Sequence, residues 1–279
     1  MKKIDRLGWA AGLSFVSYGV RVGVRVNTAA ALNFVKEHFP PGWKISDSPI
    51  VERLYSLILS GSGQRPGVRR FSLLYGDITR LARTANQDEV LDVFEADLGL
   101  YVAEMARRRI FVHAGVVGWK GRAILLPGCS FSGKSTLIAE LVRAGATYYS
   151  DEYAVLDARG RVHPYPRPLQ IREDESAKQK KYPVETFGGQ AGTKPLPVGL
   201  IAVSKYQPGA KWRPRTLSAG RGTLELLANT VAARRQPENA LAALQQVVAR
   251  APVLKGLRGE ATETTDLILR CLDNPKERA

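Results

Sequence analysis

Residues 128–135 read GCSFSGKS, a glycine-bounded stretch of the form G-x-x-x-x-G-K-S. Its two glycines, Gly128 and Gly133, can adopt backbone angles that other residues avoid, so that successive N–H groups converge on an anion. The apolar residues 123–126 before it predict a buried strand, and residues 136–143 after it predict an amphipathic helix. A loop of this form between a strand and a helix predicts a phosphate-binding loop.

The side chains of this loop suit a nucleotide together with its metal ion. Lys134 would place its ammonium group on the β- and γ-phosphates, and the hydroxyl of Ser135 would hold Mg²⁺. The start of the helix adds the positive end of its dipole. The residues that we expect to contact ATP are Gly128, Ser130, Ser132, Gly133, Lys134, Ser135 and Thr136.

Two adjacent acids, Asp151 and Glu152, follow a predicted strand at 146–150. They stand 17 residues beyond Lys134, and one helix and one strand fill that interval, so we expect the pair beside the γ-phosphate. Phosphoryl transfer needs a carboxylate for the metal and a group that orients or deprotonates the acceptor. The residues alone leave open which acid takes which role. The alternative to a functional pair is a surface turn with two exposed acids.

One of the three histidines, His113, lies 15 residues before Gly128 on a predicted strand at 110–117. Two adjacent antiparallel strands would bring it to the phosphate end of the loop strand. There it could orient a carboxylate or share its proton, because the pKa of histidine lies near neutral pH. A single histidine on a strand is more often structural, so both interpretations stand.

The remaining pattern predicts an α/β fold of two domains. Residues 110–279 form the predicted catalytic domain, and residues 1–109 form a small α+β module of unknown role. Residues 14–26 predict a strand or a hairpin arm. Further strands are predicted at 51–59, 68–74, 77–83, 153–157, 161–163, 198–204 and 253–257. Helices are predicted at 28–37, 88–107, 224–233, 238–250 and 262–272.

Composition limits the functional classes. The 279 residues carry a formal net charge of +15, which suits nucleotide phosphates, an acidic protein substrate or nucleic acid, or reflects solvated surface arginines. No zinc finger or aromatic–basic RNA motif is present, so nucleic-acid binding is not favoured. The two cysteines, Cys129 and Cys271, lack metal-ligand spacing, and no apolar run is long enough to span a bilayer. We therefore expect a cytoplasmic protein.

Three features together resemble a known family: His113-Ala114-Gly115, the loop at 128–135 and the Asp151-Glu152 pair. They are similar to the catalytic domain of HPr kinase/phosphorylase, which phosphorylates a serine of a small carrier protein and whose fold is related to that of phosphoenolpyruvate carboxykinase. The resemblance covers residues 110–160 and continues loosely to about residue 272. It implies a P-loop core of that type, with ATP and Mg²⁺ as cofactors.

The resemblance also implies roles for the acids and the histidine. Asp151 would be the general base that takes the proton of the acceptor hydroxyl. Glu152 stands where the family has its second acid and would help Ser135 to hold the metal. His113 would lie next to the acidic pair as a catalytic residue, together with Lys134.

The chain departs from the family after the acidic pair. The family's glycine-rich signature is replaced at 162–172 by VHPYPRPLQIR. This segment looks more like divergent relatives that accompany peptide-modification gene clusters, some of which phosphorylate a serine of a precursor peptide. Arg167 in it could pair with substrate or phosphate, or the segment could be a rigid surface loop. The carrier substrate and the hexamer of the parent family are not implied, and a homo-oligomer is left open.

The leading hypothesis is an ATP-dependent serine kinase that acts on a peptide or small protein. A second hypothesis is a kinase for a small molecule. A third is a nucleotide-binding regulatory module without transfer activity, against which stand the intact Lys134, Ser135, Asp151 and His113.

Overall fold

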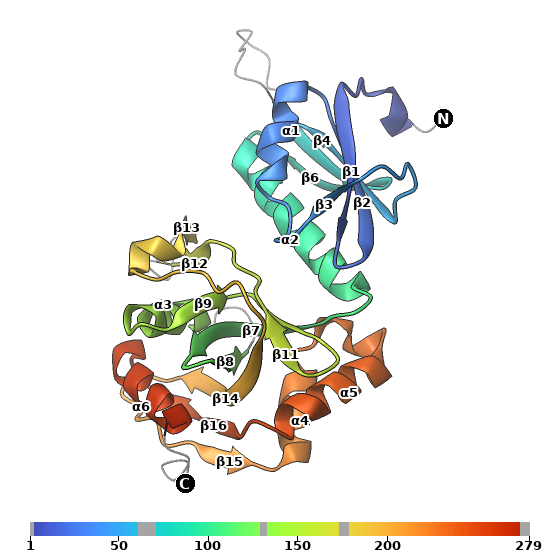
Figure 1. Ribbon diagram of the computed structural model, residues 1–279. Coiled ribbons are helices and arrows are strands. Elements are labelled where there is room, and N and C mark those ends of the chain that lie inside the picture. Colours follow the sequence, from blue (N-terminus) through green and yellow to red (C-terminus); the bar gives the residue numbers. More distant parts are fainter. Residues whose placement is uncertain (1–2, 61–70, 129–132, 173–178, 274–279) are drawn as a thin grey trace. The chain divides into compact units, whose positions relative to one another are not determined.

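The structure, a computed structural model, describes residues 3–60, 71–128, 133–172 and 179–273. The chain divides into two compact units, Met1–Arg107 and Arg108–Ala279 (Figure 1). Both units mix helices and strands, and each has a hydrophobic core of its own. The predicted boundary lies at 109/110.

The first unit is a sheet with two packed helices. Its strands follow the order β3-β1-β2-β4-β5-β6, in which β2 and β4 are parallel and the other pairs antiparallel. The strands are β1 Ala11–Ser17, β2 Val20–Val26, β3 Lys44–Ser46, β4 Arg53–Ile58, β5 Ser72–Gly76 and β6 Thr79–Thr84. The helices are α1 Ala29–Lys36 and α2 Gln87–Met105, preceded by a 3₁₀ turn at Lys3–Arg6.

The residues 14–26, predicted as a strand or a hairpin arm, belong to a hairpin of β1 and β2. Tyr18 and Gly19 both have positive φ, at 49° and 84°, which is the two-residue turn that joins twisted antiparallel strands. Every second residue of β2 is a buried valine, which packs into the core with Phe15 and Phe94. The alternating Val-Arg pattern therefore describes one arm of the hairpin.

The second unit is built on a mixed sheet in the order β11-β10-β7-β8-β14-β16-β15, with β9 also paired to β7. Strands β8, β14 and β16 are parallel, and the other pairs are antiparallel. The strands are β7 Ile110–Trp119, β8 Arg122–Pro127, β9 Thr147–Ser150, β10 Tyr153–Leu156, β11 Arg161–His163, β14 Leu196–Tyr206, β15 Arg215–Leu217 and β16 Val253–Arg258. Because β11 also pairs with β14, five of these strands close into a ring.

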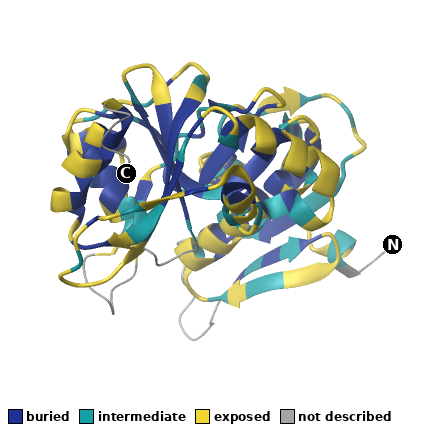
Figure 2. Ribbon diagram, turned by 90° about the horizontal axis from the view of Figure 1, so that it is seen from below, coloured by how far each residue is buried: buried dark blue, intermediate teal, exposed yellow. Residues whose placement is uncertain are grey.

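Helices cover both faces of this sheet (Figure 1). On one face α3 and α6 pack against Ile124 and Leu126 of β8, and on the other α4 and α5 pack with Ala123 and Leu125. Burial on both faces explains the continuous apolar run of β8. Figure 2 shows such strands in dark blue, with exposed residues on the helices in yellow. The helices are α3 Lys134–Arg143, α4 Ala219–Leu227, α5 Pro237–Val248 and α6 Ala261–Asp273.

Short elements complete the unit. A separate pair is formed by β12 Leu169–Ile171 and β13 Lys180–Tyr182, and 3₁₀ turns lie at Val184–Phe187 and Val231–Arg234. The helix predicted at 224–233 instead starts after Ser218, whose hydroxyl accepts a hydrogen bond from Arg221 N, and ends at Leu227. It stops there because Thr230 forms an isolated bridge with Val112 of β7, which requires an extended backbone.

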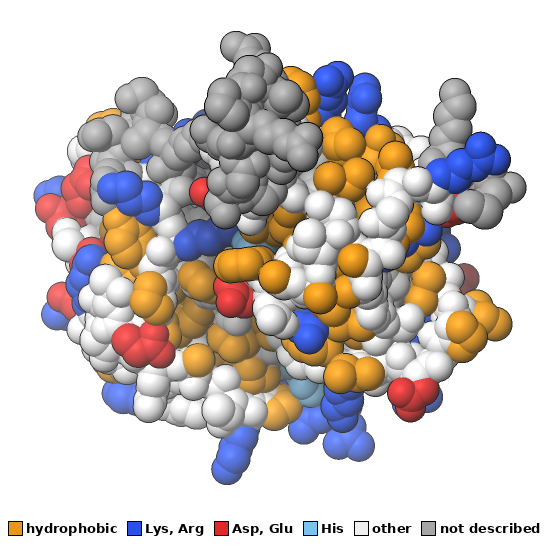
Figure 3. Space-filling view, turned by 90° about the horizontal axis from the view of Figure 1, so that it is seen from above, with side chains coloured by type: hydrophobic (Ala, Val, Ile, Leu, Met, Phe, Trp, Pro, Cys, Tyr) orange, Lys and Arg blue, Asp and Glu red, His pale blue; other side chains and the backbone are white. Residues whose placement is uncertain are grey.

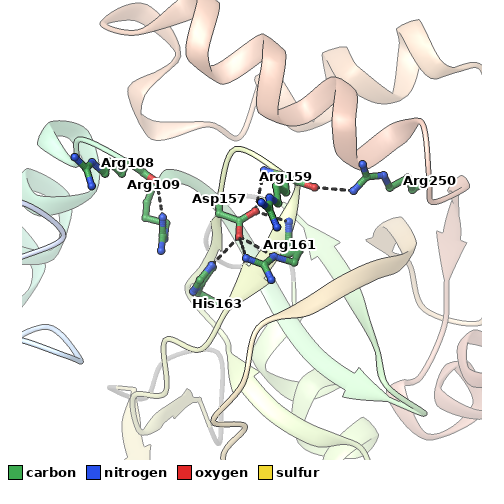
Figure 4. A network of polar contacts seen from close by, with 7 residues as sticks. All are labelled: Arg108, Arg109, Asp157, Arg159, Arg161, His163 and Arg250. Carbon is green, nitrogen blue, oxygen red and sulfur yellow. Dashed lines mark hydrogen bonds and ion pairs between the residues drawn. The ribbon is translucent and has the colours of Figure 1, made fainter.

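A single aspartate fixes the turn between β10 and β11 (Figure 4). Asp157 Oδ1 accepts hydrogen bonds from the backbone N–H groups of Arg159 and Arg161, at 2.9 and 3.0 Å. Its Oδ2 contacts Arg161 Nε at 2.9 Å and His163 Nε2 at 3.0 Å. Arg250 of the segment after α5 donates to Arg159 O at 2.8 Å and ties the turn to the helical face.

Figure 3 shows several groups of Lys and Arg side chains of the described residues at the surface, with acidic and apolar side chains also exposed. Among the helices that the structure describes, none is both long and apolar enough to cross a membrane.

Candidate active site

The candidate site lies at the edge of the sheet where the parallel strands β8, β14 and β16 end. Strand β8 runs directly into Gly128, and α3 begins at Lys134. Ser130 and Ser132, which we expect to contact nucleotide, lie outside the described residues, as does Cys129. Both ends of the predicted phosphate loop are thus placed beside each other by the strand and the helix.

Gly133 forms the N-cap of α3 in the left-handed region, with φ 75° and ψ 18°. As a glycine, Gly133 makes no side-chain capping hydrogen bond, and the backbone groups at the start of the helix carry its partial positive charge. Lys134 folds back and donates from Nζ to Gly128 O at 2.7 Å, which links the two ends of the loop. Thr136 is exposed on the first turn of the helix. This arrangement gathers positive charge at the place where phosphates are expected.

Asp151 is the most firmly held side chain of the site. Its Oδ2 accepts hydrogen bonds from Ser135 Oγ at 3.1 Å and from Gln170 N at 3.0 Å, and its Oδ1 accepts one from Tyr148 Oη at 3.1 Å. The residue is only 8% exposed. Burial raises the pKa of Asp151, although these hydrogen bonds act in the opposite direction. The structure therefore joins Ser135 and Asp151, which the spacing predicted to be near each other.

Glu152 lies beside Asp151 at a break between β9 and β10, both of which pair with β7. Ser150 Oγ accepts hydrogen bonds from the N–H groups of Glu152 and Tyr153, at 3.1 and 2.9 Å, and shapes the turn. Burial raises the pKa of Tyr153, and the neighbouring carboxylate of Glu152, which accepts its hydrogen bond, raises it further. Glu152 is less buried than Asp151, so the two acids have different environments.

His113 on β7 lies opposite Tyr153 of β10, and the two rings are 4.8 Å apart between centroids. Its backbone carbonyl accepts a hydrogen bond from Gly128 N at 3.2 Å, which places it at the base of the loop. Burial lowers the pKa of His113, and the charge of Lys134 lowers it further. Both effects favour the neutral form of His113, which lies next to the loop and to Tyr153.

The oxygen atoms of Ser135 and Asp151 form a donor set that suits Mg²⁺. In the part of the chain that the structure describes, no cluster of three or more His, Cys, Asp or Glu side chains could ligate a metal ion by itself. Magnesium bound with a nucleotide commonly takes only one or two protein ligands and completes its shell with phosphate oxygens and water. Ser135 and Asp151, joined at 3.1 Å, fit that requirement.

Three contributors to the site were not predicted as such from the sequence. Tyr148 donates to Asp151 and also contacts Arg167 O at 2.8 Å, and Gln170 supplies a backbone N–H. The proline-containing segment 162–172 thus lies against Asp151 and lines one side of the candidate site. Arg258, from β16, donates to Gly133 O at 2.9 Å. Its position 125 residues after Gly133 gave no local signal that could reveal this contact.

Neither a scan against protein-family models nor a search of curated proteins found a match to this chain.

Proposed function

We propose that this chain is an ATP-dependent phosphotransferase that moves the γ-phosphoryl group to a serine hydroxyl of a peptide or small protein. The observation that carries the proposal is the hydrogen bond between Ser135 and Asp151 beside Lys134 and the positive end of α3. A hydroxyl, a carboxylate and an ammonium group at the start of one helix are the groups that a bound nucleotide and Mg²⁺ require. The serine acceptor rests on the resemblance to HPr kinase/phosphorylase.

ATP and Mg²⁺ supply the transferable phosphoryl group and neutralise its charge. In the proposed site the N–H groups between Gly128 and Thr136 bind phosphate oxygens, and Lys134 adds a point charge. Ser135 and Asp151 hold the metal ion. Because Lys134 and Ser135 are held at the start of α3 and Asp151 is held by Tyr148 before the reaction, the site would act mainly by positioning and charge stabilisation.

Transfer forms a bond between the acceptor oxygen and the γ-phosphorus and breaks the bond to the β–γ bridging oxygen, so that ADP leaves. The acceptor hydroxyl also loses its proton, which needs a base. Asp151 is buried and accepts a hydrogen bond from Ser135, the proposed metal ligand, whereas Glu152 beside it is less buried and so more accessible to an acceptor. We therefore propose that Asp151 helps to hold the metal ion and that Glu152 takes the proton of the acceptor hydroxyl. These roles are the reverse of those that the family resemblance implies.

The experiment is phosphoryl transfer from γ-labelled ATP to serine-containing peptides, measured for the wild type, Lys134→Ala and Asp151→Asn. Lys120→Ala and Asp273→Asn are matched controls, because these residues form an exposed ion pair at the start of β8, away from the loop. Label on a peptide serine that is lost in both site variants and kept in both controls supports the proposal. Label on a small metabolite instead indicates a metabolite kinase, and tight ATP binding without transfer indicates a regulatory module; either result contradicts the peptide kinase.

A further inference from the structure

Arg258 is a buried cation at the edge of the sheet that carries the phosphate loop. It is the last residue of β16, which runs parallel to β14, and its partner in the register is Tyr206. Since β14 also runs parallel to β8, the ends of these strands meet at one edge. Arg258 is only 3% exposed, which is unusual for an arginine.

The guanidinium of Arg258 contacts the residue that closes the loop. Its Nη2 donates to Gly133 O at 2.9 Å, and its Nη1 donates to Gly259 O at 3.0 Å. The same carbonyl of Gly133 accepts the first helical hydrogen bond of α3, from Leu137 N at 3.2 Å. Arg258 therefore holds the first carbonyl of the helix on which Lys134 and Ser135 stand.

Glycine suits position 133 for two reasons. Its φ of 75° lies in the left-handed region, which L side chains rarely adopt. A Cβ atom on Gly133 would also lie 2.4 Å from Arg258 Nη2, so that the end of the arginine side chain would have to move away from the loop. The second reason has no counterpart in the loop motif, because it depends on an arginine from a distant strand.

The positive charge of Arg258 lies at the N-terminal end of α3, where the helix dipole makes a positive charge unfavourable. The N-terminal end of α3 carries partial positive charge, and cations near such an end are destabilising. Lys134 is the next residue after Gly133 and already lowers the pKa of His113. Burial lowers the pKa of Arg258, while Glu260, bonded to Tyr206 Oη at 2.8 Å, acts in the opposite direction. The negative charge of a bound polyphosphate would make the positive charge of Arg258 favourable at this place.

We propose that Arg258 is a positioning residue of the nucleotide site, which fixes Gly133 through its carbonyl and adds positive charge for the bound polyphosphate. This inference rests on the proposed function, because it needs a nucleotide at the loop. A purely structural arginine and a positioning arginine differ in the effect of their removal. Removal of a structural arginine lowers the stability of the fold. Removal of Arg258 is expected to weaken nucleotide binding and to leave the nucleotide-free protein as stable as before or more stable.

The test compares the full-length wild type with Arg258→Met, Arg258→Lys and the control Arg122→Met. Arg122 is an exposed cation at the start of β8, at the end of that strand away from the loop. Two quantities are measured: the thermal midpoint without nucleotide, and the Kd for ATP with Mg²⁺. We expect Arg258→Met to keep or raise the midpoint and to raise the Kd by about tenfold or more, the usual effect of losing a charged contact. The KM for the peptide stays unchanged, and Arg122→Met behaves as wild type.

Arg258→Lys keeps the charge and loses the two-armed geometry, so its Kd is expected between those of the wild type and Arg258→Met. An unchanged Kd in Arg258→Met overturns the inference and leaves the proposed function intact. If Arg258→Met loses both stability and affinity, Arg258→Lys decides: a wild-type midpoint with weakened binding supports positioning, and recovery of both assigns a structural role. No ATP binding by the wild type overturns the proposed function and this inference together.

Discussion

Two buried aspartates of the second unit lie in opposite electrostatic environments, although both accept several hydrogen bonds. For Asp151, burial raises the pKa above its ordinary value and the hydrogen bonds only partly offset this. For Asp157, burial also raises the pKa, but His163, Arg161 and two backbone N–H groups outweigh it and bring the pKa to about 2. Ionised Asp151 therefore destabilises the folded protein, and ionised Asp157 stabilises it.

Asp151→Asn is expected to keep the thermal midpoint of the nucleotide-free protein at pH 7, because it removes a buried charge that the fold disfavours. The same variant is expected to lose phosphoryl transfer by about a hundredfold or more, since the metal side of the site is lost. Thermal unfolding and labelled-ATP transfer on one preparation check both. A lower midpoint with transfer retained would mean that Asp151 has a structural role.

Glu152→Gln is expected to bind ATP as the wild type does and to transfer the phosphoryl group about 100- to 10,000-fold more slowly, the usual range for loss of a general base. The reason is that Gln keeps the shape of the side chain and cannot take the acceptor proton. Single-turnover transfer separates this step from binding. Full phosphoryl transfer by Glu152→Gln, together with loss of transfer in Asp151→Asn, would show that Asp151 is the general base.

Tyr148 is expected to act on catalysis through Asp151. In Tyr148→Phe the hydroxyl that contacts Asp151 Oδ1 and Arg167 O is lost, and we expect a loss of stability of about 1 kcal/mol. We also expect kcat to fall about tenfold while the KM for the peptide is unchanged, because the carboxylate is less well oriented. Urea unfolding measures the stability, and steady-state kinetics measure kcat and KM. An unchanged kcat would show that Tyr148 contributes only to packing and not to catalysis.

At the scale of elements, the hairpin β10–β11 depends on the charge of Asp157. Its pKa in the folded protein, about 2, lies below the ordinary value of 3.8, so its stabilising contribution is full above about pH 4 and is lost as the pH falls towards 2. We expect Asp157→Asn to lower the free energy of unfolding at pH 7 by about 1–2 kcal/mol. The difference from wild type shrinks as the pH falls through 4 towards 2.

Urea unfolding at pH 7 and pH 3 measures that difference, and Asp266→Asn, which changes an exposed aspartate on α6, is the control. Equal destabilisation by Asp157→Asn at the two pH values would show that the shape of the side chain, and not its charge, supports the turn.

The elements of the site differ in how well the sequence predicts them. The strand, loop ends and helix at 123–143 follow from local pattern, because glycines and apolar periodicity act within a few residues. The approach of Asp151 to Ser135 follows from the short interval between them. The break between β9 and β10 also follows from the pattern, which predicts separate strands at 146–150 and 153–157. Two features could not be predicted: the pairing of β11 with β14, and the contact of Gln170 with Asp151. Each depends on contacts between distant segments, which have no local signature.

At the scale of the whole molecule, two units carry separate hydrophobic cores, and all residues of the candidate site belong to Arg108–Ala279. The chemistry proposed for the chain is therefore located in one unit. The charge of +15 is a property of the full chain and identifies no partner by itself. The acceptor peptide is predicted from a family resemblance, whereas the loop and the acids are predicted from the residues themselves.

The proposed function depends on nucleotide binding at the start of α3 through Lys134, which equilibrium binding of ATP measures. Titration calorimetry of the full-length wild type with ATP, in the presence and absence of Mg²⁺, is compared with Lys134→Ala and the surface control Lys120→Ala. We predict that the wild type and Lys120→Ala bind ATP more tightly with Mg²⁺, and that Lys134→Ala binds it about 10- to 100-fold more weakly. Equal ATP affinity in the wild type and Lys134→Ala, or no binding by either, would show that Lys134 and the start of α3 do not form a nucleotide site.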